Sequence, residues 1–123
     1  MTSTHQIRFS VVLGQWLDQP LDADLTVARL ADSLGYDQVW VPEMAKADAP
    51  AMAATIVALT DRIEPVLGPL AVTVRSPVQI AIALQTVATE RRGVHVALGT
   101  SSSLVARWHG RSRADAASRL DTT

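Results

Sequence analysis

The stretch Ser76–Gly99, SPVQIAIALQTVATERRGVHVALG, holds one helix followed by one strand and decides the fold class. Ser76 favours a helix N-cap, Pro77 suits the first helical position, and Gln79 completes a Ser-x-x-Gln capping box. Gly93 ends the helical pattern, as glycine commonly does just beyond a helix. The residues at helical spacing that form the expected buried face are Ile80, Ala83, Leu84 and Val87.

The same alternation of apolar strand and amphipathic helix extends along the rest of the chain. We expect strands over 7–13, 37–41, 63–74 and 94–98, and helices over 21–34, 50–60, 77–92 and 113–120. Asp22 or Asp24 can cap the first helix, Gly68-Pro69 interrupts the third strand, and Ser112 can cap the last helix. This order predicts an α/β fold with four βα units and a parallel sheet. Two architectures fit it: a small doubly wound sheet, or half of a (β/α)₈ TIM barrel.

The apolar patterns also predict which side chains are buried. The strand over 7–13 is apolar at nearly every position, which is typical of a strand buried on both faces. His95 lies in the middle of an apolar strand, so we interpret it as a core histidine rather than a ligand. The stripes expected to face the core are Val27, Leu30, Ala31 and Leu34 in the first helix, and Met52, Ile56 and Leu59 in the second.

The composition indicates a soluble single domain over residues 1–123. Of the 123 residues, 48% are hydrophobic and 19% are charged, which excludes intrinsic disorder. The absence of cysteine excludes disulfides, thiolate catalysis and iron–sulfur clusters, and three dispersed histidines argue against a metal site. No apolar run reaches the roughly 18 residues that span a bilayer, and no signal-peptide pattern is present, so we expect a cytoplasmic protein.

Charge is spread unevenly along the chain. The net charge of −1 gives no general attraction to nucleic acid or to membranes. Residues 1–60 sum to −4, whereas residues 61–123 sum to +3. The excess lies mainly near the C-terminus, at Arg107, Arg111, Arg113 and Arg119. The polar, basic segment 108–123 is therefore either a solvated terminal segment or part of an anion site.

Ligands of parallel α/β folds bind at the carboxyl ends of the strands, which directs attention to the loops there. The loop after the fourth strand, Gly99-Thr100-Ser101-Ser102, combines a glycine with successive hydroxyl groups. If a helix begins there, its free N–H groups suit a phosphate, and Arg75 can add a bidentate contact. The alternative is a polar loop with an ordinary hydroxyl N-cap. No dinucleotide or P-loop fingerprint is present.

Two further groups of residues are candidates for chemistry. Glu43 follows a buried strand directly and can act as a base or bind substrate, or can be a surface acid. Trp108, His109 and Arg111 place an aromatic ring, an imidazole and a guanidinium around a glycine. This combination suits stacking and anion binding, and its alternative is a turn with one buried tryptophan.

Three stretches together resemble the luciferase-like monooxygenase superfamily, and within it the F420-dependent oxidoreductases. They are LADSLGYDQVWVPE over 30–43, LTDRIEPVLGPLAVTVRSPVQIAIA over 59–83 and VALGTSSSLVARWHGRSR over 96–113. The resemblance implies a (β/α)₈ barrel that binds F420, or alternatively FMN, at the carboxyl ends of its strands. It also implies a cis peptide and bulge behind the cofactor ring near Leu70-Ala71, and contact between the cofactor and Gly99-Thr100.

The resemblance departs from the sugar-phosphate dehydrogenases of the superfamily at two positions. Glu43-Met44 replaces their Asp-His pair, and Ser102 or a neighbour replaces their glutamate. Both departures argue against sugar oxidation by that mechanism. We therefore expect hydride transfer to or from another small organic substrate. The alternative is a non-catalytic, truncated or split barrel that only binds cofactor or serves in assembly.

The chain has about half the roughly 200 to 250 residues of a full barrel. Strands at both edges of a half-barrel offer unpaired backbone groups. We therefore expect a homo-oligomer or a complementary half-barrel partner. Two copies can close an eight-stranded pseudo-barrel, or the second and third helices can pack across a dimer.

Overall fold

A computed structural model describes residues 6–14, 17–89 and 92–123, and it confirms an α/β fold with four parallel strands that alternate with helices. The elements are β1 (Ser10–Val12), α1 (Leu21–Ser33), β2 (Gln38–Val41), α2 (Ala49–Leu59), β3 (Glu64–Ala71), α3 (Pro77–Val87), β4 (His95–Gly99), α4 (Ser103–Trp108) and α5 (Ala116–Thr122). The sequence patterns did not predict α4 as a separate helix. None of the described helices is long and apolar enough to cross a membrane.

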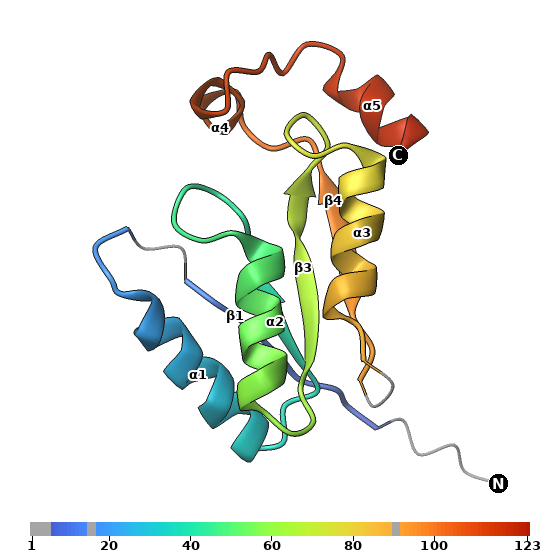
Figure 1. Ribbon diagram of the computed structural model, residues 1–123. Coiled ribbons are helices and arrows are strands. Elements are labelled where there is room, and N and C mark those ends of the chain that lie inside the picture. The colour runs from blue at the N-terminus through green and yellow to red at the C-terminus, as the bar shows by residue number, and fades with distance from the viewer. Residues whose placement is uncertain (1–5, 15–16, 90–91) are drawn as a thin grey trace, which may run out of the picture.

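The strand order decides between the two architectures that fit the sequence. The strands lie in chain order, β1-β2-β3-β4, and all of them are parallel. A doubly wound sheet reverses its strand order and carries helices on both faces. Here the order never reverses, and α1, α2 and α3 line one face of the sheet, as Figure 1 shows. The arrangement is that of half a barrel, and the opposite face of the sheet corresponds to the barrel interior.

The core lies between this sheet and the three helices. Val39 and Leu67 of the sheet and Ile56 of α2 are completely buried there. Ala28 and Ala53 are equally buried, and their small side chains let α1 and α2 lie close to the strands. Burying one large aliphatic side chain contributes roughly 1.5–3 kcal/mol, so this single layer carries most of the stability of the fold.

The first strand differs from its prediction. It spans only Ser10–Val12 instead of 7–13, and it is not buried on both faces. Ile7, Phe9 and Val12 are all exposed, with 64% of the Val12 surface accessible. The physical reason is that β1 is an edge strand whose second face no described element covers. An apolar sequence indicates that a strand is suited to burial. Where no neighbouring element covers the strand, its apolar side chains stay exposed.

The core-facing stripe of α1 was predicted correctly at Ala31 and wrongly at its other three positions. Asp24, Ala28 and Ala31 are buried, whereas Val27, Leu30 and Leu34 are exposed. The helix carries apolar residues on two faces, and the sheet selects the face with the smaller side chains. Its N-cap is Pro20, with no side-chain cap from Asp22 or Asp24. In α2, Met52 and Ile56 are buried as predicted, but Leu59 is nearly half exposed.

The capping box of α3 is confirmed in both directions. Ser76 Oγ accepts from the Gln79 backbone N–H, and Gln79 Oε1 accepts from the Ser76 backbone N–H. The helix ends earlier than predicted, at Val87. Arg92, the last residue of the predicted helix, donates to the backbone carbonyl groups of Val57 and Thr60 at the end of α2. Arg91, which also belongs to the predicted helix, lies outside the described residues.

The third strand runs through Gly68-Pro69 and ends at Ala71, whereas the sequence predicted an interruption followed by strand up to residue 74. The register shifts between Leu67 and Leu70, so a bulge absorbs the proline that cannot donate to the ladder. The cis peptide bond in this region is the prolyl bond Gly68-Pro69 and not the bond near Leu70-Ala71 that the resemblance implied.

Two polar residues lie elsewhere than predicted. His95 is not a core residue: half of its side chain is exposed, and its Nε2 lies 2.8 Å from Oε2 of Glu64. Strand side chains alternate between faces, and Val96 occupies the core side, so His95 takes the face that the helices leave open. Ser112 does not cap the last helix, because Asp115 is the N-cap residue of α5.

Candidate functional site

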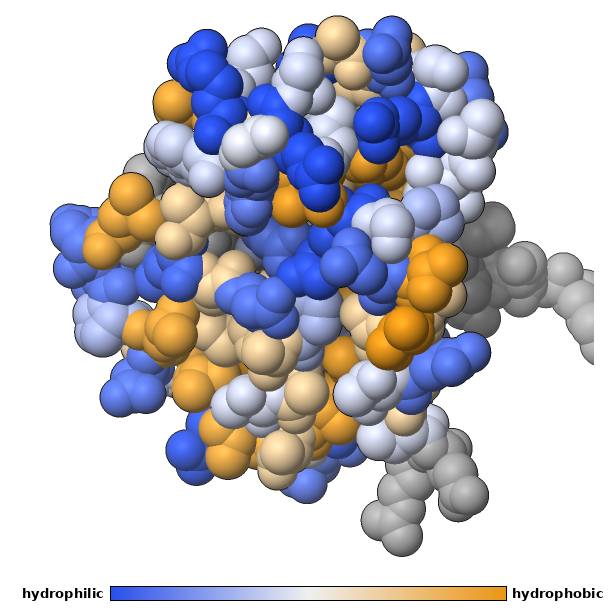
Figure 2. Space-filling model, turned by 45° about the horizontal axis from the view of Figure 1, so that its top comes forward, coloured by the Kyte–Doolittle hydropathy of each residue, from blue (hydrophilic) through white to orange (hydrophobic). Residues whose placement is uncertain are grey.

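The carboxyl ends of β2, β3 and β4 meet at one end of the molecule, where α4 and α5 also lie (Figure 1). Figure 2 brings this end forward and shows many hydrophilic side chains gathered there, with apolar ones among them. Two cavities open at this end. The larger has a volume of about 390 Å³ and the smaller about 220 Å³. Val74, Arg75 and Gln79 line both, so the two cavities adjoin.

Glu43 lies in the wall of the larger cavity, and its carboxylate is fully engaged. Arg75 Nε donates to Oε1 and Arg75 Nη2 donates to Oε2, each over 2.7 Å. The backbone N–H of Ala49 donates to Oε2 as well, at the first turn of α2. The side chain is only 10% exposed. The geometry therefore makes Glu43 a clamp between the loop after β2, the start of α2 and the loop after β3.

Arg75 is likewise committed to protein partners. Besides Glu43 it forms an ion pair with Asp48, which also caps α2 by accepting from the Ala51 N–H. Hydrogen bonds to Glu43 raise the pKa of Arg75 above its ordinary value, against the opposing effect of burial, and the charges of Glu43 and Asp48 add to the rise. Sequence reasoning offered Arg75 as a partner for a ligand anion, but two carboxylates already neutralise it.

A second charged pair lies beside the larger cavity. Lys46 Nζ donates to Asp24 Oδ2 over 2.7 Å, and the two side chains are only 6% and 9% exposed. Asp24 comes from α1 and Lys46 from the loop before α2, so the pair joins two neighbouring units. The sequence analysis offered Asp24 only as a helix cap and did not single out Lys46, because nothing local links positions so far apart.

The loop after β4 has a defined conformation. Ser101 takes a positive φ of 59°, and Ser102 caps α4 by accepting from the Val105 N–H. A helix therefore begins there, which meets the condition that the sequence analysis set for a phosphate site. The arginine that holds the loop is Arg113, whose Nε donates to the Ser101 carbonyl over 2.7 Å and whose Nη2 donates to Thr100 Oγ1 over 3.0 Å.

Gly99 brings the end of β4 close to the bulge in β3. A Cβ atom built on Gly99 would lie 3.2 Å from Cβ of Pro69, which is tighter than ordinary contact. Pro69 is exposed, in contrast to the buried residues around it in β3. We call these two residues the flat patch, because Gly99 adds no side chain beside Pro69 at the end of β4. Leu70 and Ala71 are buried beside it, so their side chains do not project into the open.

The Trp108-His109-Gly110-Arg111 segment does not form one cluster. Half of the Trp108 surface is exposed, so the alternative of a turn with one buried tryptophan is wrong. Trp108 lines neither cavity. His109 lines the larger cavity, and Arg111 lines the smaller. The residues are consecutive at the end of α4, where the chain turns and points them in different directions.

Two residues of the smaller cavity escaped sequence reasoning. Thr73 follows β3 and is 5% exposed, and Arg119 lies on α5. The excess of positive charge near the C-terminus was the only signal for Arg119, and no pattern marked Thr73. The described residues contain no group of three or more histidine, aspartate or glutamate side chains that could hold a metal ion.

Comparisons with known proteins agree with this architecture. A family model described as luciferase-like monooxygenase matches residues 2–123. Among solved structures, the chain resembles the oxygenating constituent of 3,6-diketocamphane monooxygenase from the CAM plasmid of Pseudomonas putida, a type II Baeyer–Villiger monooxygenase in complex with FMN. The TM-score is 0.74 at 14% sequence identity, over 95% of this chain and 37% of that one. No curated protein matches the chain.

Proposed function

The chain belongs to the luciferase-like monooxygenase family, and from this we propose that it forms the cofactor-binding half of a flavin- or F420-dependent oxidoreductase. The reaction would be hydride transfer to or from a small organic substrate. In this proposal residues 1–123 act as one half-barrel domain, with 108–123 as its polar basic end. The chain spans 37% of the length of the solved structure that it resembles. The proposal includes a second copy or a complementary half-barrel as the partner.

The observation that carries the proposal is the flat patch of Gly99 and Pro69. It lies near the carboxyl ends of β3 and β4. A planar ring system needs a wall from which no side chain projects, and the close approach of these two residues supplies one. The patch thus fits a flavin or deazaflavin ring. Leu70 and Ala71, being buried, would support this wall from behind rather than touch the ring with their side chains.

The neighbouring residues would position the ring and its substrate. Thr100, Ser101 and Ser102 offer hydroxyl and backbone groups along one side, and Arg113 fixes their loop. His109 would contact ligand from the wall of the larger cavity. We assign Trp108 to the rim, and we leave Arg111 out of the cofactor contacts because it lines the smaller cavity.

When bound, the cofactor would supply the hydride-transferring centre, so the protein contributes orientation and electrostatics. The larger cavity lies within the range of about 300–1,000 Å³ that small-molecule sites occupy. It would receive the organic substrate beside the ring. Glu43 acts in this scheme as a positioning residue, because Arg75 and the Ala49 N–H already occupy its carboxylate oxygens.

Two cofactors are in competition. The sequence motifs resemble those of F420-dependent enzymes, whereas the solved structure of similar fold contains FMN. Titration of the chain with each, followed by fluorescence, tests the proposal directly. Saturable binding of either cofactor, lost in a Gly99→Leu variant that fills the flat patch, would support it. Retention of binding in that variant, or no binding of either cofactor, would contradict it.

The alternative is a non-catalytic module that binds cofactor or assembles with a partner. The exposed β1 edge and the exposed apolar face of α1 favour an assembly role. Turnover separates the two functions: cofactor binding without hydride transfer, in the oligomer or with the complementary half, would favour the module.

A further inference from the structure

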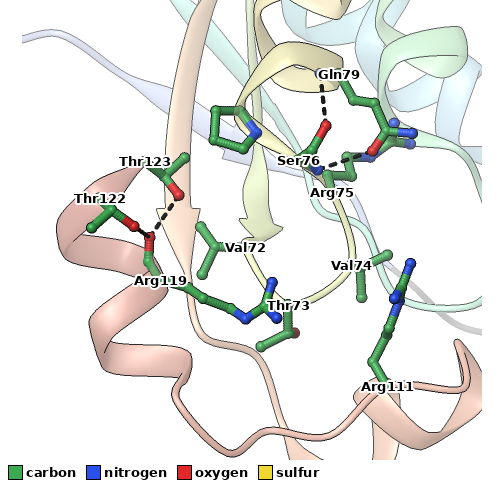
Figure 3. A pocket seen from close by; sticks show the side chains of 11 residues that line it. Val72, Thr73, Val74, Arg75, Ser76, Gln79, Arg111, Arg119, Thr122 and Thr123 are labelled. Carbon is green, nitrogen blue, oxygen red and sulfur yellow. Dashed lines mark hydrogen bonds between the residues drawn. The ribbon is translucent and has the colours of Figure 1, made fainter.

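The smaller cavity contains two arginines that the fold itself does not use. Arg111 and Arg119 both line it, and Figure 3 shows them approaching from different segments of the chain. Neither side chain forms a hydrogen bond or an ion pair within the part of the chain that the structure describes. The other arginines nearby are committed, Arg75 to Glu43 and Asp48, and Arg113 to the loop after β4.

Thr73 provides an independent sign of a missing ligand. Its hydroxyl is buried and finds no hydrogen-bond partner among the described residues, although the residue lines the same cavity. A buried hydroxyl without a partner costs about 1–3 kcal/mol and is rare in native proteins. Figure 3 shows the guanidinium of Arg119 pointing toward Thr73. Since the Oγ1 atom is closed to water, a ligand can reach it only if a neighbouring side chain such as that of Arg119 moves aside.

The remaining wall also favours an anion. The cavity lies at the N-terminus of α3, whose dipole places partial positive charge there. The α3 capping box already satisfies the N–H groups of Ser76 and Gln79, so the helix contributes potential and not hydrogen bonds. Among the described residues, no acidic side chain lines the cavity.

We propose that the smaller cavity binds the oxyanion end, carboxylate or phosphate, of a small organic anion, held by Arg111, Arg119 and the Thr73 hydroxyl. The volume of about 220 Å³ falls below the range of about 300–1,000 Å³ for complete small-molecule sites, so only one end of a ligand enters. Two guanidinium groups suit either planar or tetrahedral oxyanions. The site adjoins the larger cavity across Val74 and Arg75, and this places the rest of the ligand there.

Calorimetric titration of the full chain with inorganic phosphate and with succinate tests the site without any cofactor. Each arginine is exposed and makes no side-chain contact, so Arg111→Gln and Arg119→Gln leave the fold intact. We expect each to weaken anion binding by roughly 10- to 100-fold, the effect of one lost charge-assisted hydrogen bond. Thr73→Val should weaken it less, while raising the melting temperature of the free protein because the orphan hydroxyl is gone.

Arg107→Gln is the matched control. Arg107 carries the same charge, lies on α4 and lines neither cavity. Anion binding that is unchanged in Arg107→Gln but weaker in the cavity variants supports the site. The probe with the higher affinity, phosphate or succinate, shows whether the site prefers a phosphate or a carboxylate group. Failure of both probes to bind at millimolar concentration, or an equal loss in the control, would overturn it.

A cofactor titration distinguishes this site from the proposed function. FMN and F420 affinities should be unchanged in Arg111→Gln and Arg119→Gln, measured in phosphate-free buffer. A parallel loss of cofactor affinity would show that the cavity holds the cofactor phosphate, and would overturn the proposal of a separate site. If neither cofactor binds but phosphate does, the proposed function fails and the anion site stands.

Discussion

Arg75 and Glu43 form a bidentate pair in which Nε and Nη2 of the arginine donate to the two carboxylate oxygens, each over 2.7 Å. The pair connects the loop after β2 to the loop before α3. Because both groups are largely buried, each depends on the other to offset the cost of leaving water.

Glu43→Gln should therefore lower the free energy of unfolding by about 2–3 kcal/mol, since the uncharged amide leaves Arg75 without its main counter-charge. Urea denaturation measures this. Glu64→Gln is the control, because Glu64 pairs with the half-exposed His95 and should cost less than about 1 kcal/mol. Equal losses in the two variants would show that the Glu43–Arg75 pair stabilises the fold no more than the Glu64–His95 pair does.

The buried pair of Asp24 and Lys46 predicts a non-additive result. Lys46→Met alone strands a buried carboxylate and should destabilise the protein by about 3–5 kcal/mol. The double variant Asp24→Leu with Lys46→Met removes both charges and should recover most of that loss. Thermal denaturation of the wild type, both single variants and the double variant completes the cycle. Additive losses would mean that the two groups do not interact.

Asp32 predicts an acid-sensitive contribution to stability. Burial alone raises the pKa of Asp32, but hydrogen bonds from the backbone N–H groups of Asp61, Ile63 and Arg62, with the charge of Arg92, outweigh it and lower the pKa below 3.8. A carboxylate with a depressed pKa stabilises the fold above pH 3.8, and this contribution is lost as the pH falls through the folded-state value.

Asp32→Asn should consequently lower the free energy of unfolding by about 1–2 kcal/mol at pH 6, because the variant lacks the charged hydrogen bonds of the carboxylate. The difference from the wild type should shrink between pH 4 and pH 2. Unfolding free energies measured across this range check the prediction. A difference that stays constant with pH would assign the effect to geometry rather than to charge.

The exposed face of α1 predicts self-association through the open edge of the half-barrel. Val27, Leu30 and Leu34 are exposed on one side of the helix, and β1 is an edge strand of the sheet. Leu30→Lys should dissociate the oligomer to a monomer of 13.2 kDa in light scattering. Ile82→Lys, on the exposed face of α3, should have no such effect. The reverse pattern would favour a dimer through the second and third helices, and a wild-type monomer at micromolar concentration would exclude both.

Local patterns predicted the elements with local causes. The Ser76 and Gln79 capping box depends on residues three positions apart, so it was readable and is confirmed. The α1 register was not readable, because Val27 and Leu30 are more apolar than the buried Ala28, and only the neighbouring sheet selects the face with the smaller side chains.

The candidate site shows the same limit more strongly. Its loops were placed correctly at the carboxyl ends of the strands, since a parallel sheet gathers them there. The side-chain partners within the site were not predicted correctly. Arg92 reaches α2, and Arg113 rather than Arg111 holds the loop after β4, through contacts between residues far apart in sequence. Which partner a side chain as long as that of arginine contacts is determined by the folded backbone and cannot be read from the local sequence.

Lys46 is the only lysine in the chain, and its ammonium group is sealed against Asp24. Amine-directed reagents therefore find no accessible lysine in the native fold. Acylation of Lys46 can proceed only when the loop before α2 lifts away from α1, so its rate under native conditions measures how often that corner of the half-barrel opens. Mass spectrometry of Lys46 acylation therefore measures local unfolding of this corner without any engineered label.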